Sequence, residues 1–242
     1  MIKVSDLYKS YEGQTVLEGI NLEIAEGEFC AILGGSGSGK SVLLRHLIGL
    51  EKPDHGHVFI NGTDITLLSE GDLLTVRKNI GYLFQAGALY DSFTVRENVA
   101  FPLSEHTKMS WEEIWRKVDE LLEQVGLEAA KDKLPSELSG GMNKRAALAR
   151  AVVMDSKILL CDEPTSGLDP ILSREISDLI KNVSRQLKST TVVTSHDVNN
   201  ALRIADRIVL IKDKRILMQG TPAEFRHTKD FFIRDFLDVC RV

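Results

Sequence analysis

Apolar and polar positions along the chain follow two different periods. Short apolar runs rich in β-branched residues alternate with segments in which apolar residues recur at helical spacing. This alternation is typical of an α/β protein built around a mostly parallel sheet, whose strands are covered on both faces and read as continuous apolar runs. The strands predicted for this sheet are Phe29–Leu33, Ile80–Phe84, Ile158–Cys161, Thr191–Thr194 and Ile208–Ile211.

Three stretches in the first quarter of the chain show a period of two instead. Ile2–Leu7, Ile20–Ile24 and Val58–Ile60 alternate apolar with polar residues. Such alternation places apolar side chains on one face of a strand only. These stretches predict an additional, half-exposed antiparallel sheet.

The middle of the chain, residues 91–154, contains no convincing strand pattern. Ser110 and Glu113 suit a capping box, and the apolar residues that follow recur on one helical face until Gly126. The pattern predicts a helical insertion in the α/β core. We therefore predict a single domain over residues 1–242, with residues 1–90 and 155–242 as the core and its β subdomain, and residues 91–154 as a helical subdomain.

The composition is that of an ordinary globular protein, with 43% hydrophobic and 27% charged residues. A formal net charge of −5 argues against a dedicated nucleic-acid-binding protein, because such proteins carry a basic surplus or stripe. No apolar run approaches the roughly 18 residues of a spanning helix, and the first ten residues resemble a strand and not a secretory signal. We expect a cytoplasmic protein in which Cys30, Cys161 and Cys240 are buried, reduced thiols.

Residues 34–41 match the pattern GxxxxGK[ST] between a predicted strand and a predicted helix, the context of a phosphate-binding loop. Backbone N–H groups must approach the phosphate oxygens closely, and glycine leaves room because it has no Cβ atom. Lys40 would reach the β- and γ-phosphates of ATP, and the Ser41 hydroxyl would bind Mg²⁺. The alternative is a glycine-rich turn with a chance Lys-Ser pair. The predicted ATP site comprises Gly34, Gly35, Ser36, Gly37, Ser38, Gly39, Lys40 and Ser41.

Two acidic residues end the predicted strand Ile158–Cys161. Asp162 and Glu163 would lie at the carboxyl end of a parallel strand, where open α/β sheets bind their ligands. Asp162 suits the Mg²⁺ shell, and Glu163 suits a base that polarises water for attack on the γ-phosphate. An acidic strand end that only improves solubility is the alternative interpretation.

A second anion site is predicted ahead of an apolar helix, Ala146 to Val153. Ser139 suits a helix cap, and Gly140 and Gly141 behind it expose backbone donors at the positive end of the helix. Two phosphate-binding segments in one chain make sense if each serves a different ATP, held between two subunits. An ordinary capped helix is the alternative.

Four segments in this order carry a resemblance to a known family: GGSGSGKS, LSGGM, LLCDEPTSGLDP and VVTSHD. From end to end, the chain resembles the nucleotide-binding subunit of ABC transporters. A finer resemblance, to ATPases of the Mla/Mce type that power lipid movement at bacterial envelopes, lies in ILGGSGSGKSVLLRHLIGL, GYLFQAGALYDSFTVRENVAFPL, ELSGGMNKRAALARAV and FFIRDFLDV. The resemblance implies a P-loop NTPase fold, ATP and Mg²⁺ as ligands, and ATP hydrolysis coupled to transport.

The resemblance also implies roles for four further residues. Tyr11 matches the aromatic residue that stacks on adenine, with neighbouring Tyr8 as its rival. Gln85 resembles the glutamine that contacts Mg²⁺ and water, and His196 resembles the histidine that contacts the γ-phosphate. Asp169 resembles the aspartate that crosses the dimer interface, and it also suits a helix cap. Each of the four has an ordinary structural alternative at a strand end, strand edge or helix start.

The predicted catalytic residues are therefore Glu163, His196 and Gln85, and the predicted Mg²⁺ ligands are Ser41, Asp162 and Gln85. One departure from the wider family is Met142, in the fifth position of the signature, where glutamine is usual. According to the resemblance, methionine at this position is typical of the lipid-transporting branch.

The resemblance implies a homodimer at the cytoplasmic face of the inner membrane that drives a separate integral-membrane permease. For the lipid branch it also implies a periplasmic lipid-binding subunit of the Mce type, and it implies no nucleic acid. The alternative is the ATPase of an importer for a small polar solute such as an amino acid, because this subunit never touches the cargo. ABC ATPases that act on DNA or ribosomes would carry a long coiled-coil insertion or two phosphate loops, and this sequence has neither.

Two apolar segments suit contacts with partners. The segment 86–101 predicts a permease-binding groove built from part of its apolar residues, with the remainder in the core. The segment Phe231–Val239 predicts a helix that packs on its own core or clasps a neighbouring subunit. The first segment carries the apolar residues Leu89, Tyr90, Phe93, Val95 and Phe101 among others.

Overall fold

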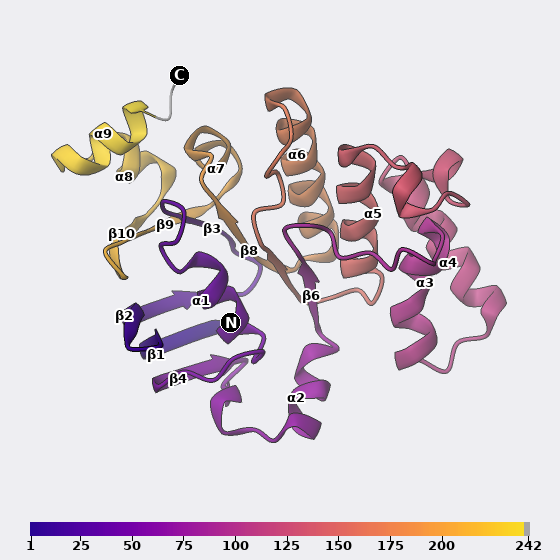
Figure 1. The fold of residues 1–242 in the computed structure, drawn as a ribbon, viewed down its shortest axis with the longest axis horizontal. Coiled ribbons are helices and arrows are strands. Elements are labelled where there is room, and N and C mark those ends of the chain that lie inside the picture. Colours follow the sequence, from indigo (N-terminus) through magenta and orange to yellow (C-terminus); the bar gives the residue numbers. More distant parts are fainter. Residues whose placement is uncertain (240–242) are drawn as a thin grey trace.

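Two β-sheets organise the part of the chain that the structure, a computed structural model, describes: residues 1–239 (Figure 1). The strands of the larger sheet are β3 (Phe29–Leu33), β6 (Ile80–Leu83), β7 (Ile158–Cys161), β8 (Thr190–Ser195), β9 (Arg207–Lys212) and β10 (Arg215–Gly220). Their order is β10-β9-β3-β8-β7-β6. Pairing is parallel from β9 to β6, and the edge strand β10 is antiparallel to β9.

The helices alternate with these strands along the chain and lie around the sheet (Figure 1). Their arrangement confirms the predicted α/β, P-loop type of fold. In chain order they are α1 (Lys40–Leu47), α2 (Glu70–Arg77), α3 (Val95–His106), α4 (Trp111–Gln124), α5 (Gly140–Val152), α6 (Pro170–Leu187), α7 (Val198–Ile204), α8 (Pro222–Arg226) and α9 (Phe231–Val239).

The central strands are buried on both faces. Every residue of β3, β6, β7 and β8 is buried, which explains their continuous apolar runs. Successive side chains of β3 enter two different apolar clusters: Cys30 and Ile32 pack in one, and Phe29, Ala31 and Leu33 pack in the other. The phosphate loop, which follows β3, is therefore attached to a strand that is buried on both faces.

The smaller sheet is antiparallel and covers the first of these clusters. Its strands are β1 (Ile2–Tyr11), β2 (Gln14–Ile24), β4 (His55–Ile60) and β5 (Thr63–Asp64), in the order β2-β1-β4-β5. Burial alternates along much of β1 and β2, so one face packs inward and the other is exposed. The half-exposed antiparallel sheet predicted from the alternating pattern is present.

Helices α3, α4 and α5 pack together around a third apolar cluster, at the right of Figure 1. The capping box predicted at the start of α4 is formed: Ser110 N–H donates to Glu113 Oε2 at 2.7 Å, and Glu113 N–H donates to Ser110 Oγ at 3.3 Å. Residues 91–154, all of them described, contain no strand. This third cluster meets the second through Leu121 and Leu179, which pack against both.

Several boundaries differ from the prediction. β6 ends at Leu83, and Phe84 is outside the strand and 40% exposed. The helix predicted from Ala146 begins earlier, at Gly140, because Ser139 caps it directly. The strand β10 was not predicted, although its exposure alternates residue by residue.

The remaining expectations concern the cysteines, the C-terminal helix and the membrane. Cys30 and Cys161 are buried free thiols, and burial raises the pKa of Cys30 to about 12; Cys240 lies outside the described residues. Ile233 and Leu237 pack in the second cluster, so α9 lies on its own core. None of the helices within residues 1–239 combines the length and apolar character needed to span a bilayer.

Candidate active site

The phosphate loop connects β3 to α1 at the carboxyl edge of the large sheet. Lys40, the first residue of α1, is 5% exposed, and its ammonium donates to the carbonyl oxygens of Gly34 and Gly35, both at 3.0 Å. Gly39 has a φ of 96°, which favours glycine, and a Cβ atom at Gly34 would lie 2.7 Å from the Ile211 carbonyl oxygen. The loop therefore requires glycine for its backbone angles and for space.

Ser41 and Asp162 meet at the same edge, as predicted from the strand-end position of the acid. The Ser41 hydroxyl donates to Asp162 Oδ1 at 2.7 Å, and the Thr194 hydroxyl donates to the same oxygen at 2.8 Å. Asp162 follows β7 and Thr194 lies in the neighbouring strand β8. These two donors offset the desolvation of a carboxylate whose residue is only 8% exposed.

Glu163 lies between a buried and an exposed partner. Its backbone has a φ of 41°, in the left-handed region, and its N–H donates to the Thr194 hydroxyl at 2.9 Å. One carboxylate oxygen is 3.2 Å from Lys40 Nζ, and the other is 3.4 Å from His196 Nδ1. A left-handed non-glycine residue is costly and persists only where its surroundings hold it. The structure thus brings Lys40, Glu163 and His196 into one row that opens toward solvent at His196.

Gln85 lies at this edge without touching the row. Asp162 N–H donates to the Leu83 carbonyl at 2.8 Å, so the residues that follow β6 and β7 leave the sheet side by side. The Gln85 backbone carbonyl accepts a hydrogen bond from the Lys144 ammonium of α5. No hydrogen bond within residues 1–239 joins the Gln85 side chain to Ser41 or Asp162, so its role as a Mg²⁺ ligand stays a prediction.

The second predicted anion site lies at the start of α5. Ser139 Oγ accepts a hydrogen bond from the third backbone N–H of this helix at 3.3 Å. Asp169 caps α6 by accepting hydrogen bonds from two N–H groups of its first turn, at 2.9 and 3.0 Å. A Cβ atom at Gly140 would lie 3.4 Å from the Leu168 side chain, and Gly141 is buried. In the described chain, no hydrogen bond or ion pair joins this pair of helix starts to the phosphate loop.

Tyr11 is tied to the helix that begins at the phosphate loop. Its hydroxyl donates to the Glu51 carboxylate, which pairs with Arg45 of α1 at 2.8 Å. Burial and this hydrogen bond raise the pKa of Tyr11 to about 12, although the residue is 39% exposed. The rival Tyr8 packs edge-on against His55, with ring centroids 5.8 Å apart. Of the two tyrosines, Tyr11 is the one joined to α1 through Glu51, and its role at adenine stays a prediction.

This edge of the sheet fits a nucleoside triphosphate and Mg²⁺. Ser38 Oγ is buried and has no hydrogen-bond partner among the described residues, so a polar group is missing beside the loop. No group of three or more His, Cys, Asp or Glu within residues 1–239 could hold a metal ion alone. Mg²⁺ prefers one or two carboxylates together with phosphate oxygens, and the Ser41 hydroxyl and Asp162 carboxylate match that partial donor set.

A family model described as "ABC transporter" matches residues 17–166, which include the phosphate loop, Gln85, Ser139, Asp162 and Glu163. The chain belongs to the ABC transporter family. It is therefore an ATP-binding subunit of ATPase type, as predicted. The roles of the individual residues of this ABC subunit stay predictions.

Relatives named for the transport of different substrates are similar to this ABC subunit. The probable ribonucleotide transport ATP-binding protein mkl of Mycobacterium leprae is 44% identical over 100% of this chain and 70% of its own length. The intermembrane phospholipid transport ATP-binding protein MlaF of Haemophilus influenzae is 40% identical over 98% of this chain and 90% of its own. The methionine import ATP-binding protein MetN of Mannheimia succiniciproducens is 41% identical over 98% of this chain and 70% of its own length.

A solved ATP-binding cassette supports the ABC fold. It is a dimer in a post-hydrolysis state bound to ADP and Pi, and it matches with a TM-score of 0.85 and 36% identity, over 92% of this chain and 99% of that one. The phospholipid-transport relative confirms the predicted resemblance of the ABC subunit to ATPases of the Mla type.

Three residues of the site were not predicted: Thr194, Glu51 and Lys144. Thr194 is the last threonine of a threonine-rich strand, β8, which lies beside the strand that Asp162 follows, and this was a usable signal. Lys144 lies on the same helical face as Gly141, Ala147 and Leu148, which are all buried. Lysine is rarely buried unless it has a partner, so this position was a usable signal. The role of Glu51 could not be predicted from the sequence, because its contact with Tyr11 joins residues 40 positions apart.

We expect Glu163→Gln to keep ATP binding and to slow hydrolysis by on the order of 10²-fold or more, the scale of a lost general base. Lys40→Ala should instead weaken ATP binding, because it removes the buried ammonium of the loop. Steady-state ATPase rates and binding of a fluorescent ATP analogue would measure both. Wild-type turnover in Glu163→Gln would show that another group handles the attacking water.

Proposed function

We propose that this ABC subunit works as a homodimer at the cytoplasmic face of the inner membrane, where it hydrolyses ATP to power lipid transport through a separate permease. The observation that carries the ATPase part is the row of Lys40, Glu163 and His196 beside the Ser41–Asp162 pair. The lipid part rests on similarity to the phospholipid-transport relative and on Met142 in the signature.

Each residue of the row has a task that its position allows. The Lys40 ammonium is held at the centre of the loop, where it would bind the β- and γ-phosphates. Glu163, fixed by Thr194, would orient water and accept its proton, and exposed His196 would contact the γ-phosphate from the solvent side. Mg²⁺, when bound near Ser41 and Asp162, neutralises charge on the phosphate oxygens.

The second anion site supports the homodimer. Ser139 and Gly140 are exposed at the positive end of α5, and Asp169 lies beside them, yet this site is separate from the phosphate loop of its own chain. A second copy would supply the ATP that this site contacts. The dimeric state of the similar solved cassette supports the same arrangement.

A mixture of two inactive variants tests the composite site. Lys40→Ala and Ser139→Arg should each lose ATPase activity, the second because a bulky cation blocks the interface. A mixed dimer keeps one undamaged pairing of loop and signature, so the mixture should recover activity above either variant alone. Undiminished activity in both single variants would contradict a shared site.

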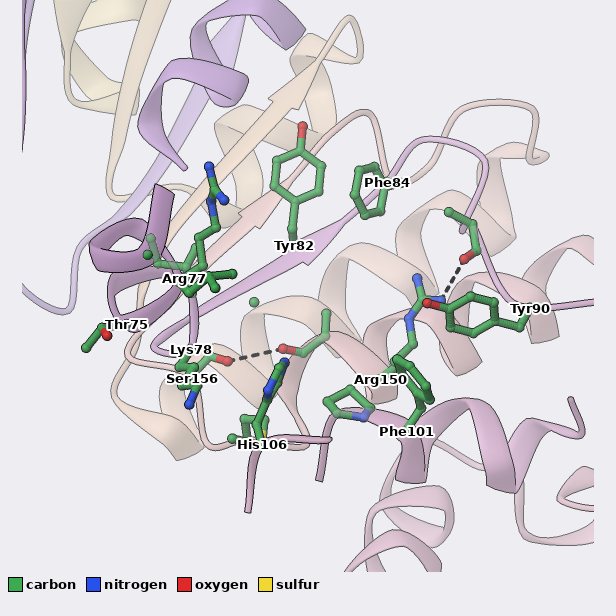
Figure 2. Close-up of a pocket in the computed structure, with 18 residues that line it drawn as sticks. Thr75, Arg77, Lys78, Tyr82, Phe84, Tyr90, Phe101, His106, Arg150 and Ser156 are labelled. Atoms are coloured by element: carbon green, nitrogen blue, oxygen red, sulfur yellow. Dashed lines mark hydrogen bonds between the residues drawn. The ribbon is translucent and has the colours of Figure 1, made fainter. Parts of the chain in front are cut away.

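A groove of about 670 Å³ supports the permease contact (Figure 2). It is lined by α2, β6, α3 and the end of α5. Phe84, Tyr90 and Phe101 line one side, with the Tyr90 and Phe101 ring centroids 5.0 Å apart, whereas Lys78 and His106 lie on another side. None of its lining residues is Asp or Glu. These properties suit a cytoplasmic helix of the permease that carries apolar and acidic side chains.

The apolar residues predicted for this groove divide between groove and core. Tyr90 and Phe101 line it, and Tyr90 is 47% exposed. Val95 is fully buried, and Leu89 packs against both the second and third clusters, so these two belong to the part of the segment that lies in the core. Phe93 packs against the rings of Tyr90 and Phe101 without lining the groove.

Leu74→Asp tests the groove at a residue remote from the ATP site. Leu74 is 56% exposed and lines the groove on α2. The substitution should abolish co-purification of the permease with the tagged subunit from native membranes, while ATP binding by the isolated subunit stays unchanged. Leu67→Asp is the matched control, because Leu67 is 76% exposed and lies outside the groove. Equal permease recovery from all three proteins would show that the permease docks elsewhere.

The lipid assignment has its own test against the importer alternative, which the methionine-import relative favours. Deleting the gene should disturb the distribution of envelope lipids and leave uptake of amino acids intact. The complex purified from native membranes should contain bound lipid and a lipid-binding subunit of the Mce type. Unchanged envelope lipids, with an amino-acid permease in the complex, would favour the importer and leave the ATPase assignment in place.

A further inference from the structure

The loop that follows β6 is wound in an unusual way. Gly87 has a φ of 81°, and Ala88 next to it has a φ of 52°, so two successive residues adopt left-handed backbone angles. Such angles are disfavoured for alanine because its Cβ atom crowds the backbone. The Gly87 N–H donates to the Phe84 carbonyl at 2.9 Å, which closes the turn. Strained segments of this kind persist only where neighbouring groups fix them.

Two cations of α5 fix the carbonyl groups of this loop. The Lys144 ammonium donates to the Gln85 carbonyl. The Arg150 guanidinium donates to the carbonyls of Ala88 at 2.6 Å and Gly87 at 2.8 Å. Lys144 and Arg150 are six residues apart in α5, about 1.7 helical turns, so together they hold both ends of the loop against this helix.

Neither cation has an acidic counter-ion in the described part of the chain. Lys144 is 7% exposed, and no carboxylate within residues 1–239 forms an ion pair with it or with Arg150. Burial lowers the pKa of the Lys144 ammonium and that of the Arg150 guanidinium. Burying a cation without a carboxylate is unfavourable, so these two side chains are poor candidates for simple core packing.

We propose that Lys144 and Arg150 form a clasp, defined as these two side chains on the carbonyls of Gln85, Gly87 and Ala88, that fixes the loop after β6. In this clasp Lys144 is a positioning residue for Gln85. The inference rests on the proposed function, because it uses Gln85 as a ligand near the γ-phosphate.

The clasp links three places on the molecule. Helix α5 starts at the Ser139 anion site, carries Lys144 in its second turn and has Arg150 in its last turn, where Arg150 lines the groove with Ala88 and Tyr90. Figure 2 shows Arg150 beside Tyr90, joined to the neighbouring loop by its hydrogen bond. A helix seated in the groove therefore touches the same loop that carries Gln85.

Hydrogen exchange of the whole purified subunit tests the clasp without using catalysis. Lys144→Met keeps much of the side-chain volume and removes the donor, so exchange of amides in residues 85–89 should rise by about tenfold or more, the effect of losing one hydrogen bond from a charged group. Lys144→Arg should keep the protection of the wild-type protein. Arg145→Met is the matched control, because Arg145 lies on the same helix but donates to the carbonyl of a different loop, that of Val125, at 3.0 Å.

The same variants then undergo ATPase assays. Lys144→Met should lower kcat by about tenfold with KM changed less than threefold, and Lys144→Arg should restore kcat, whereas Arg145→Met should resemble wild type. Unchanged exchange in Lys144→Met would overturn the clasp. Raised exchange with wild-type kcat, or an equal loss in Arg145→Met, would overturn its positioning role. If the wild-type protein hydrolyses no ATP, the proposed function fails, while the exchange data still decide whether the clasp exists.

Discussion

Parallel pairing in register is the constraint on which the candidate site depends. Leu83 pairs with Cys161, Cys161 with Val193, and Leu33 with Ser195, so four strands end at one edge of the sheet. Each is followed at once by a residue or loop of the site. A slip of one residue in β7 would turn its side chains to the opposite face and separate Asp162 from Ser41. Contacts as short as 2.7 Å therefore depend on the packing of buried apolar strands.

Local positive charge matters more to this site than the acidic total of the chain. Lys40 and Lys144 are both nearly buried, and both ammonium groups donate to backbone carbonyls, in the phosphate loop and in the loop after β6. Carbonyl oxygens carry only partial negative charge, so they orient the Lys144 ammonium without neutralising it, whereas the Lys40 ammonium also lies 3.2 Å from a Glu163 carboxylate oxygen. A formal charge of −5 is thus compatible with an edge built to attract a polyanion.

Features encoded by adjacent residues could be predicted from the sequence, and features made by distant residues could not. The strand Ile158–Cys161 and the phosphate loop follow from apolar runs and glycine spacing. The meeting of Ser41 and Asp162 follows from the rule that ligands bind at strand ends. β6 was predicted one residue too long, because the apolar run continues into Phe84 while the chain already turns. β10 was missed because its hairpin has positive φ at Asp213 and Lys214, without the glycine that usually reveals such a turn.

The position of β3 has a consequence for how the protein is made. β3 ends at residue 33, and its partners β8 and β9 begin at residues 190 and 207. At translation rates of about 5–20 residues per second, roughly 10–30 s separate the synthesis of the phosphate loop from that of the first strand that flanks it. During that interval the apolar run Phe29–Leu33 has no sheet to join, which exposes it to premature association and to chaperones. The ATP site is then assembled late, when the last fifth of the chain has left the ribosome.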